Sequence, residues 1–285
     1  MKPDFMLCES IGKDAVFKLG EMWIANTKFD GERIMAILGS PNNSVVLSNR
    51  RGNIKNESFP EVVESLMKLN RTCILDGEVI SEDDDFHKLQ QRSATKDKFR
   101  RELLRKQIPV KFCVFDILML DEVDLRNEPY WKRKEILGKL IVADEYVEVV
   151  ADVSIDIGYI DAVENDKEGI VVKDINSRYE GRRSPAWLKC KRWEEGTLRV
   201  TKYEVNNKGV RVEDDMANAV QVQSLNGTLV KEKIIKQGYC DIDIQYLEKE
   251  STGKLRFPSF RNIKKERKNT NSSYDREDIK NDEHL

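Results

Sequence analysis

Apolar residues recur through the first 193 residues in runs whose spacing alternates between that of strands and that of helices. The run VKFCVFDILML at residues 110–120 is strongly apolar and rich in β-prone side chains, which predicts a central strand buried on both faces. Helical spacing predicts one helix opened by Pro60 and closed by Asn70, and another over residues 131–142. Strands are expected at residues 44–48, 145–150 and 168–173. The pattern is that of an α+β domain.

The pattern changes after residue 196. Short strand candidates follow, separated by turns rich in Asn, Gly and Asp, and no helix of note is predicted among them. They lie at residues 197–204, 210–213, 219–222, 228–230 and 239–247. This series predicts a small all-β barrel, for which an OB-fold is the natural candidate.

Composition and charge refine this division of the chain. We expect domains over residues 1–193 and 194–268, and a disordered tail over residues 269–285, which are polar and nearly free of apolar side chains. Charged residues make up 35% of the chain and the formal net charge is -2, so overall charge predicts no affinity for polyanions. No apolar run is long enough for a signal peptide or a membrane span. We expect a soluble, intracellular, monomeric protein that binds no membrane.

Cysteine and histidine contents exclude several kinds of site. The five cysteines stand far apart, with no CxxC pair and an odd count, which argues against a zinc site and a disulfide framework. With only two histidines, histidine-based triads and metal clusters are not expected. Lysines, arginines and carboxylates must therefore carry any chemistry.

Two segments carry dense positive charge. Residues 88–111 hold nine lysines and arginines against only Asp97 and Glu102, and Phe99, Leu103 and Leu104 form a narrow apolar seam. This predicts a surface helix with an outward basic face, which is either simply solvated or in contact with phosphates. Residues 178–192 hold a second basic cluster. There Lys189 and Lys191 alternate on a predicted strand and should point to one face.

The segment TKFDGER at residues 27–33 is the candidate reactive site, on a bend between two predicted strands. A lysine amine attacks phosphorus only in its neutral form, so Lys28 needs nearby cations or desolvation, which Arg33 and distant basic residues can supply. Gly31 allows a sharp backbone turn. The pair Asp76-Gly77 has two readings, as a hairpin turn or as part of a second binding segment that carries Glu78.

Taken together, these motifs resemble those of ATP-dependent DNA ligases, within the covalent nucleotidyltransferases. The resemblance covers nearly the whole ordered chain and rests on segments that come in the family's order. They are KFDGER at 28–33, NRRG at 49–52, LDGEVI at 75–80, FHKLQQR at 86–92, VFDIL at 114–118, EGIVVK at 168–173, RYEGRRS at 178–184 and WLKCK at 187–191.

The resemblance implies a fold, a reaction and a role for each matched residue. It implies a nucleotidyltransferase (adenylation) domain of mixed antiparallel sheets and helices, followed by the OB-fold domain. Lys28 would take AMP from ATP and pass it to the 5′-phosphate of nicked duplex DNA, which is then sealed. The remaining roles are as follows: Lys189 and Lys191 neutralise the α-phosphate, Glu168 holds Mg²⁺, Asp30 and Arg33 position nucleotide and nick, Arg50 grips the nick phosphate, Glu78 binds the ribose, and Phe115 stacks on adenine.

Two departures from the family pattern concern loading with ATP. Asn26 stands where the family commonly has glutamate, yet its side-chain oxygen can still accept a hydrogen bond from the adenine amino group. Residues 264–267 read KKER where the family usually has R-x-D-K. Lysine for arginine keeps the charge there but loses the bidentate fork, so we expect the first reaction step to be weakened.

Other readings stay open at this stage. An RNA ligase or an mRNA-capping guanylyltransferase would use the same lysine, although residues 86–92 and 187–191 favour a DNA ligase. A catalytically inactive nucleic-acid-binding module is an alternative from a different class. A two-domain ligase without a further DNA-binding domain would close on DNA by a hinge, which we place at residues 193–196.

Overall fold

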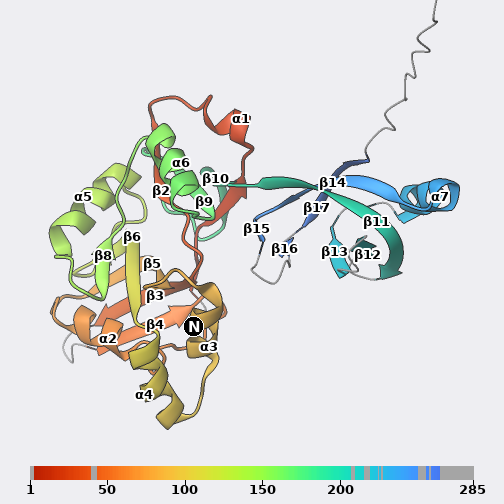
Figure 1. The fold of residues 1–285 in the computed structure, drawn as a ribbon. Helices are drawn as coiled ribbons and strands as arrows, with labels where there is room; N and C mark the ends of the chain where they lie inside the picture. The colour runs from red at the N-terminus through yellow and green to blue at the C-terminus, as the bar shows by residue number, and fades with distance from the viewer. Residues whose placement is uncertain are drawn as a thin grey trace, which may run out of the picture. The chain divides into compact units, whose positions relative to one another are not determined.

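The computed structural model of the protein describes residues 3–39, 44–206, 209–214, 219–223, 225, 227–249, 255–256 and 258–263. The chain forms two compact units, Met1–Arg192 and Trp193–Leu285 (Figure 1). The predicted tail at 269–285 and the motif at 264–267 lie outside the described residues.

The first unit contains a four-stranded sheet with the order β1-β10-β9-β2. Its strands are β1 (Leu7–Ser10), β10 (Arg183–Lys191), β9 (Gly169–Asp174) and β2 (Trp23–Thr27). Helix α6 (Ile155–Glu164) covers one face, where Ala25, Ile170 and Val172 are buried with Tyr159 and Ala162 of the helix, and α1 (Lys13–Val16) adds Val16 to this core. Because side chains alternate along a strand, Asn26, Val171 and Lys173 point to the opposite face.

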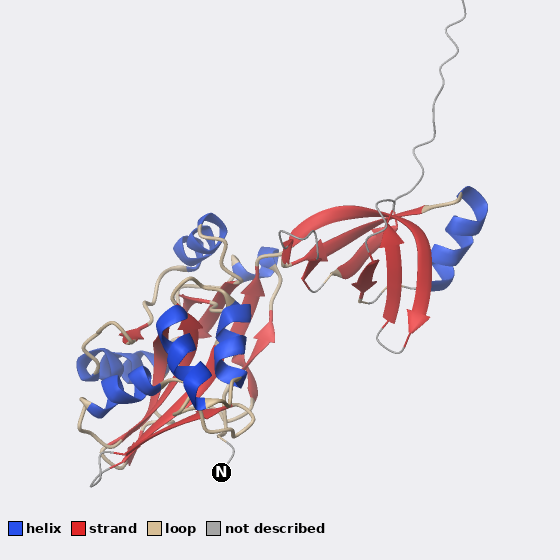
Figure 2. Cartoon of the chain, turned by 60° about the horizontal axis from the view of Figure 1, so that its bottom comes forward, coloured by secondary structure: helices blue, strands red, loops and turns tan. Residues whose placement is uncertain are grey.

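The second sheet of this unit has the order β4-β3-β5-β6-β7, with β8 added in parallel to β6. Its strands are β4 (Ser44–Asn49), β3 (Glu32–Gly39), β5 (Cys73–Ser81), β6 (Val110–Leu120), β7 (Val123–Asp124) and β8 (Val147–Val149). One face packs on α2 (Pro60–Met67) and α5 (Tyr130–Leu140), and Figure 2 shows helices on the outside of the strands. The predicted central strand and both predicted helices are confirmed, within a few residues at their ends.

Asp76-Gly77 is not a hairpin turn, which corrects one of the two readings of this dipeptide. Both residues lie inside β5, between β3 and β6. A Cβ on Gly77 would come within 2.5 Å of the Phe112 ring and 2.6 Å of the Cys113 carbonyl oxygen. The glycine is therefore required by the close approach of β6 and not by a turn.

The basic segment over residues 88–111 differs from the prediction in two ways. Its surface helix is present as α4 (Lys98–Gln107), after α3 (Phe86–Ala94), but Phe99 is 88% exposed and Leu103 54% exposed, so Leu104 alone of the apolar seam is buried. Five of the nine cations form ion pairs with carboxylates that lie outside residues 88–111. The pairs are Lys88–Asp83, Arg92–Glu61, Arg101–Glu57, Arg105–Glu64 and Lys111–Glu148.

Arg92 in particular does not belong to an exposed basic face. It is 1% exposed, and its guanidinium donates to both oxygens of Glu61 at 2.6 and 2.7 Å and to the carbonyls of Ser58 and Ile108. It ties α3 to α2 and to the residues before β6.

The second unit is built on a strongly curved five-stranded sheet with the order β13-β12-β11-β14-β17 (Figure 1). Its strands are β11 (Glu194–Asn206), β12 (Gly209–Asp214), β13 (Ala219–Val222), β14 (Cys240–Tyr246) and β17 (Ser259–Ile263), and β15 (Glu248–Lys249) pairs with β16 (Leu255–Arg256). Buried Val200, Val212 and Ile242 contribute to its core.

One prediction for this unit is wrong. Residues 228–230 form no strand but lie in helix α7 (Gly227–Gln237), where Val230 and Ile234, four residues apart, pack on the strand core. A window of three residues is too short to distinguish the two-residue period of a strand from the 3.6-residue period of a helix. The predicted hinge at residues 193–196 stays a prediction; its residues Glu194, Glu195 and Gly196 lie in β11 and pair with β14.

No helix within the described ranges is long and apolar enough to span a membrane.

Candidate functional site

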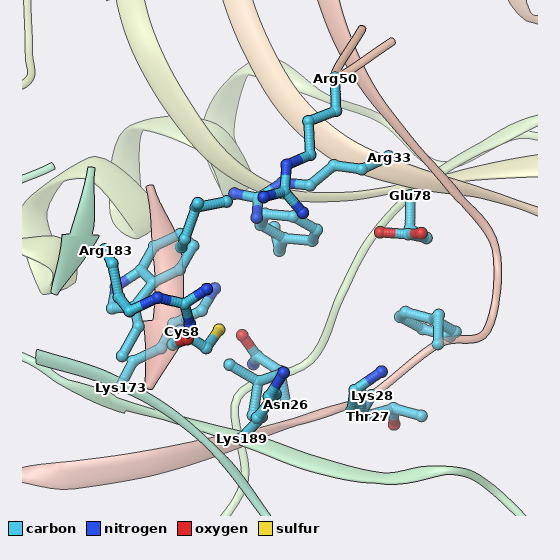
Figure 3. Close-up of a pocket in the computed structure, with 15 residues that line it drawn as sticks. Cys8, Asn26, Thr27, Lys28, Arg33, Arg50, Glu78, Lys173, Arg183 and Lys189 are labelled. Carbon is cyan, nitrogen blue, oxygen red and sulfur yellow. Dashed lines mark hydrogen bonds between the residues drawn. The ribbon is translucent and has the colours of Figure 1, made fainter. Parts of the chain in front are cut away.

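A cavity of about 230 Å³ lies between the facing surfaces of the two sheets of the first unit (Figure 3). The four-stranded sheet lines it with Asn26, Val171, Lys173, Trp187 and Lys189, and the second sheet with Arg33, Glu78 and Phe115. The register explains the first group: Val171 pairs with Asn26 on one side and Lys189 on the other, and Lys173 pairs with Trp187. Residues of both sheets therefore converge on one space.

Lys28 lies where the chain crosses from β2 of one sheet to β3 of the other. Its backbone N–H donates to the Gly169 carbonyl at 2.9 Å, which anchors the crossing to β9. Three residues on, a Cβ on Gly31 would come within 2.3 Å of the Val79 carbonyl oxygen. Gly31 lies at a bend of the backbone, as predicted, and the close approach of the connection to β5 is a second reason for glycine there.

The Lys28 amine is bound to a carboxylate that is shared with a second lysine. Glu168 accepts a hydrogen bond from Lys28 Nζ through Oε2, and its Oε1 lies 2.9 Å from Lys191 Nζ. Burial raises the pKa of Glu168, but the charge of Lys28 and hydrogen bonds from Lys191 and Lys28 outweigh it and hold this pKa below its ordinary value. The carboxylate is therefore ionised at neutral pH.

Lys189 adds a third amine on the same strand as Lys191. Partial burial, together with the positive charges of Lys191 and Lys28, lowers the pKa of Lys189. The prediction that Lys189 and Lys191 share a face agrees with their positions, since Lys189 lines the cavity and Lys191 reaches Glu168 at its rim.

Arg33 is held rigidly on its inner side. Its Nε and Nη2 donate to the two oxygens of the fully buried Asp76 at 3.0 and 2.7 Å, and Tyr179 donates its hydroxyl to the same carboxylate at 2.7 Å. Burial lowers the pKa of Arg33, but Asp76 more than compensates and raises it above the ordinary value. The guanidinium also lies 5.2 Å from the centre of the Phe115 ring, so it remains a permanent cation beside an aromatic surface.

Glu78 lies opposite Arg33 on the neighbouring strand. Desolvation raises its pKa to about 8, against the opposing charges of Arg33 and Lys28. At neutral pH this side chain is thus largely protonated in the unliganded protein and can both donate and accept hydrogen bonds.

Asn26 is buried, and a polar network behind it fixes its amide. Its Nδ2 donates to the Ala151 carbonyl at 2.9 Å and to Asp152 Oδ1 at 2.7 Å. Because both contacts are acceptors, the nitrogen must face them. Oδ1 is then the polar atom left for the cavity, with the Tyr130 hydroxyl 3.4 Å away.

A second cavity of about 440 Å³ adjoins the first and shares Arg33, Arg50 and Glu78 with it. Residues of α3, among them Phe86, Leu89 and Gln90, line its other side. Arg50 is exposed at the end of β4 and borders both spaces. Figure 3 shows it beside Arg33, across the cavity from Asn26 and Lys189.

The predicted site residues fall into two groups. Those lining the first cavity are Asn26, Lys28, Arg33, Arg50, Glu78, Phe115 and Lys189. Glu168 and Lys191 join this group through their contacts with Lys28, whereas Asp30 is half-buried in the β2–β3 connection and does not line the cavity.

Among the cavity-lining side chains that sequence reasoning did not assign to the site are Lys173, Arg183 and Trp187. All three stand inside segments that the motif comparison singled out. The strand period carried a signal for two of them, since Lys173 shares the face of Val171 and Trp187 shares the face of Lys189.

Within the described residues, no group of three or more His, Cys, Asp or Glu side chains is arranged to hold a metal ion. Glu168 is the carboxylate in contact with Lys28. Mg²⁺ binds proteins through one or two carboxylates and completes its shell with substrate phosphates and water, so the single carboxylate of Glu168 is a ligand of the type that this ion uses.

Comparison with known proteins agrees with the motifs. Residues 5–191 match the family described as the ATP dependent DNA ligase domain. A probable DNA ligase of Dictyoglomus thermophilum is 28% identical over 201 residues, which cover 66% of this chain and 34% of that protein. The SPbeta prophage-derived DNA ligase-like protein LigB of Bacillus subtilis is 30% identical over 190 residues, which cover 64% of this chain and 66% of that protein.

The chain thus spans about a third of the length of the Dictyoglomus protein. Among solved structures, the ligase domain of LigD from M. tuberculosis aligns with a TM-score of 0.58 and 20% identity, covering 92% of this chain and 95% of that one. This likeness establishes the fold, a mixed arrangement of helices and sheets like that of ligase domains.

Proposed function

Since the chain belongs to the ATP-dependent DNA ligase family, we propose that it seals nicks in duplex DNA through an AMP-lysine formed on Lys28. The observation that carries this proposal is the position of the Lys28 amine. It lies on the connection between two sheets, at one side of a cavity that holds an aromatic ring and polar side chains, and it contacts Glu168, whose other carboxylate oxygen binds Lys191 of β10.

In the first step, the nitrogen of the neutral Lys28 amine bonds to the α-phosphorus of ATP as the bond to pyrophosphate breaks; pyrophosphate leaves, and the proton released by the nitrogen passes to water. Lys189 and Lys191 lie beside the nucleophile and balance the charge that develops on the phosphoryl oxygens. The pair between Lys28 and Glu168 must open first, because the nitrogen that attacks phosphorus cannot at the same time stay bound to the carboxylate.

We assign Glu168 as the protein ligand of Mg²⁺. The ion would supply positive charge to the phosphates of ATP. Glu168 is ionised and lies at the rim of the cavity, next to the amine that attacks. Its two lysine contacts occupy the carboxylate in the unliganded protein, so the residue that would bind the metal also restrains the nucleophile.

We assign other residues that line the cavity to the adenine, ribose and phosphate groups of ATP. Phe115 provides a half-buried ring for stacking on adenine, and Glu78 provides a carboxyl group for the ribose hydroxyls. Arg33, fixed by Asp76, and Asp30 on the connection after Lys28 would keep ribose and phosphate in register with the amine. Precise placement of this kind contributes much of the rate in phosphoryl transfer.

In the second and third steps AMP passes from Lys28 to the 5′-phosphate at the nick, and the adjacent 3′-hydroxyl displaces it. We assign Arg50 to the nick phosphate, because it is exposed and borders both cavities. The second cavity, between β4 and α3, is the space for the DNA end beside it.

We also propose the domain roles. Residues 1–193 form the nucleotidyltransferase (adenylation) domain and residues 194–268 an OB-fold domain, in which the curved five-stranded sheet and α7 supply the barrel. The protein would act on nicked duplex DNA as a monomer. The departure at residues 264–267 remains the reason to expect weak loading with ATP.

The experiment is to incubate the protein with Mg²⁺ and radiolabelled ATP or GTP, denature it, and then chase with nicked DNA or nicked RNA. We expect covalent label from ATP, none in Lys28→Ala, and transfer to nicked DNA. Label from GTP would identify a guanylyltransferase, and transfer to nicked RNA alone an RNA ligase. An absence of covalent label from either nucleotide would leave the inactive binding module as the better account.

A further inference from the structure

Helix α4 presents two large apolar side chains to solvent. Phe99 is 88% exposed and Leu103 is 54% exposed, and because they lie four residues apart they share one face of the helix. The opposite face holds α4 against the rest of the unit, since Leu104 is buried and Arg101 pairs with Glu57. The exposed pair therefore lies on the outer face of α4.

Positive charge surrounds this pair. Lys98, Arg100 and Lys106 are exposed on the same helix, in which Glu102 is the one acidic residue. Within the described ranges, none of these three cations is among the five of this segment that form ion pairs. The outer face of α4 thus combines apolar surface with positive charge.

Helix α6 presents the complementary combination. Tyr159 and Ala162 on its inner face pack on the four-stranded sheet. On its outer face Ile157 is 60% exposed, Ile160 55% and Val163 46%. This helix, with the sequence IDIGYIDAVE, contains no lysine or arginine. Its exposed carboxylates are Asp156, Asp161 and Glu164.

The two outer faces do not meet within one copy of the chain. Figure 1 shows α4 and α6 at opposite ends of the first unit. Helix α6 covers the four-stranded sheet on the side away from the cavity, whereas α4 follows α3, which lines the second cavity. A contact between the faces must therefore join two copies, and it is head-to-tail because two different surfaces meet.

We propose that the outer face of α4 in one copy binds the outer face of α6 in another copy. The apolar side chains of both helices would leave water in this contact, and the cations of α4 would meet the carboxylates of α6. Each pair of copies keeps one unused face of each kind, so further copies can add in a row. This inference goes beyond the proposed function, since all residues assigned to the ligase reaction come from one copy.

The contact is small, which limits its strength. Two helices of ten residues each bury less surface than the roughly 1,200–2,000 Å² of stable interfaces, so the dissociation constant is expected above about 1 μM. Copies would associate transiently at high local concentration. The cavity of each copy stays open, because α6 lies on the other side of its sheet.

Charge reversal tests this contact in the free protein, without nucleotide or DNA, so the result is independent of the ligase proposal. One variant reverses α4 (Lys98→Glu, Arg100→Glu and Lys106→Glu), and another reverses α6 (Asp156→Lys, Asp161→Lys and Glu164→Lys). Association is measured by sedimentation equilibrium at low salt, where exposed charges interact most strongly. Wild type should associate. Each variant alone should associate at least roughly tenfold more weakly, because like charges then face each other.

Two rescues distinguish a lost contact from a loss of folding. An equimolar mixture of the two variants should associate again, since each acidic face then has a basic face to bind. A single chain that carries both reversals should associate like wild type for the same reason. Failure of both rescues would overturn the proposal, as would a wild type that stays monomeric up to about 1 mM.

Single apolar substitutions supply a matched control that leaves the charges in place. Phe99→Ser and Ile160→Ser should each weaken association, whereas Val142→Ser, which changes a residue that is 87% exposed outside both faces, should not. Equal association of all three variants with wild type would contradict the contact. If Phe99→Ser associates like wild type but binds intact duplex DNA more weakly, α4 is a DNA-binding face and the proposal fails.

Discussion

The Lys28 amine is hydrogen-bonded to the Glu168 carboxylate, so the proposed nucleophile and the proposed metal ligand bind each other directly. The same carboxylate also binds Lys191. For Lys28 to react with ATP, its contact with Glu168 must therefore break. The role of this carboxylate can be tested by removing its charge.

Glu168→Gln should raise the Mg²⁺ concentration needed for half-maximal adduct formation and lower the maximal rate, because an amide is a weaker ligand for a hard cation than a carboxylate. The measurement is a Mg²⁺ titration of the labelling rate. Glu148→Gln, which changes a partly exposed carboxylate paired with Lys111, is the control. An unchanged Mg²⁺ requirement in Glu168→Gln would contradict the assignment.

Asp76→Asn should destabilise the first unit by roughly 3–5 kcal/mol, the usual cost of breaking a buried ion pair from one side. Asp76 is fully buried and accepts from Arg33 and from the Tyr179 hydroxyl, and all three contacts change. The free energy of unfolding is measured with urea. In the control Asp121→Asn, which breaks an exposed pair with Arg71, we expect a loss below about 1 kcal/mol. Equal losses would show that the Arg33 pair contributes little.

Lys173 should make stability depend on pH. Its pKa is about 7 in the folded protein against 10.5 ordinarily, so the unfolded chain binds more protons between these values. Stability therefore rises with pH through this window, by at most about 1.4 kcal/mol per pH unit from this residue. Below pH 7 the full penalty remains.

The measurement compares the unfolding free energies of wild type and Lys173→Met from pH 6 to pH 10. The variant should be more stable than wild type at pH 6, and the difference should shrink as pH rises above 7. A difference that does not vary with pH would mean that the buried amine keeps an ordinary pKa.

Arg50→Ala and Arg92→Ala should have opposite consequences. Arg50 is exposed beside both cavities, so its loss should slow sealing of nicked DNA while leaving unfolding nearly unchanged. Arg92 is buried against Glu61, so its loss should cost roughly 3–5 kcal/mol of stability. Nick sealing by adenylated protein and urea unfolding are measured for both. If Arg92→Ala is fully stable but fails to bind DNA, Arg92 belongs to a DNA-binding face after all.

Local patterns in the sequence were sufficient to predict many of the strands and helices. The two-residue period of a strand requires only neighbouring residues, and it correctly placed Lys189 and Lys191 on one face and residues 110–120 in a buried strand. The order of the motifs along the chain was sufficient to identify the protein family. Where the apolar window was short, as at residues 228–230, local pattern failed, because packing of Val230 and Ile234 decides the helix.

Only the tertiary structure determined which charged side chains, distant in sequence, form ion pairs. Lys28 meets Glu168 across 140 positions, and Arg92 meets Glu61 across 31, because two sheets and their helices face each other in one particular way. The same packing encloses Lys173 among three rings. The sequence alone determined which side chains share a strand face. The contact of Lys28 with Glu168 and the burial of Lys173 depend on which faces come together in the folded protein.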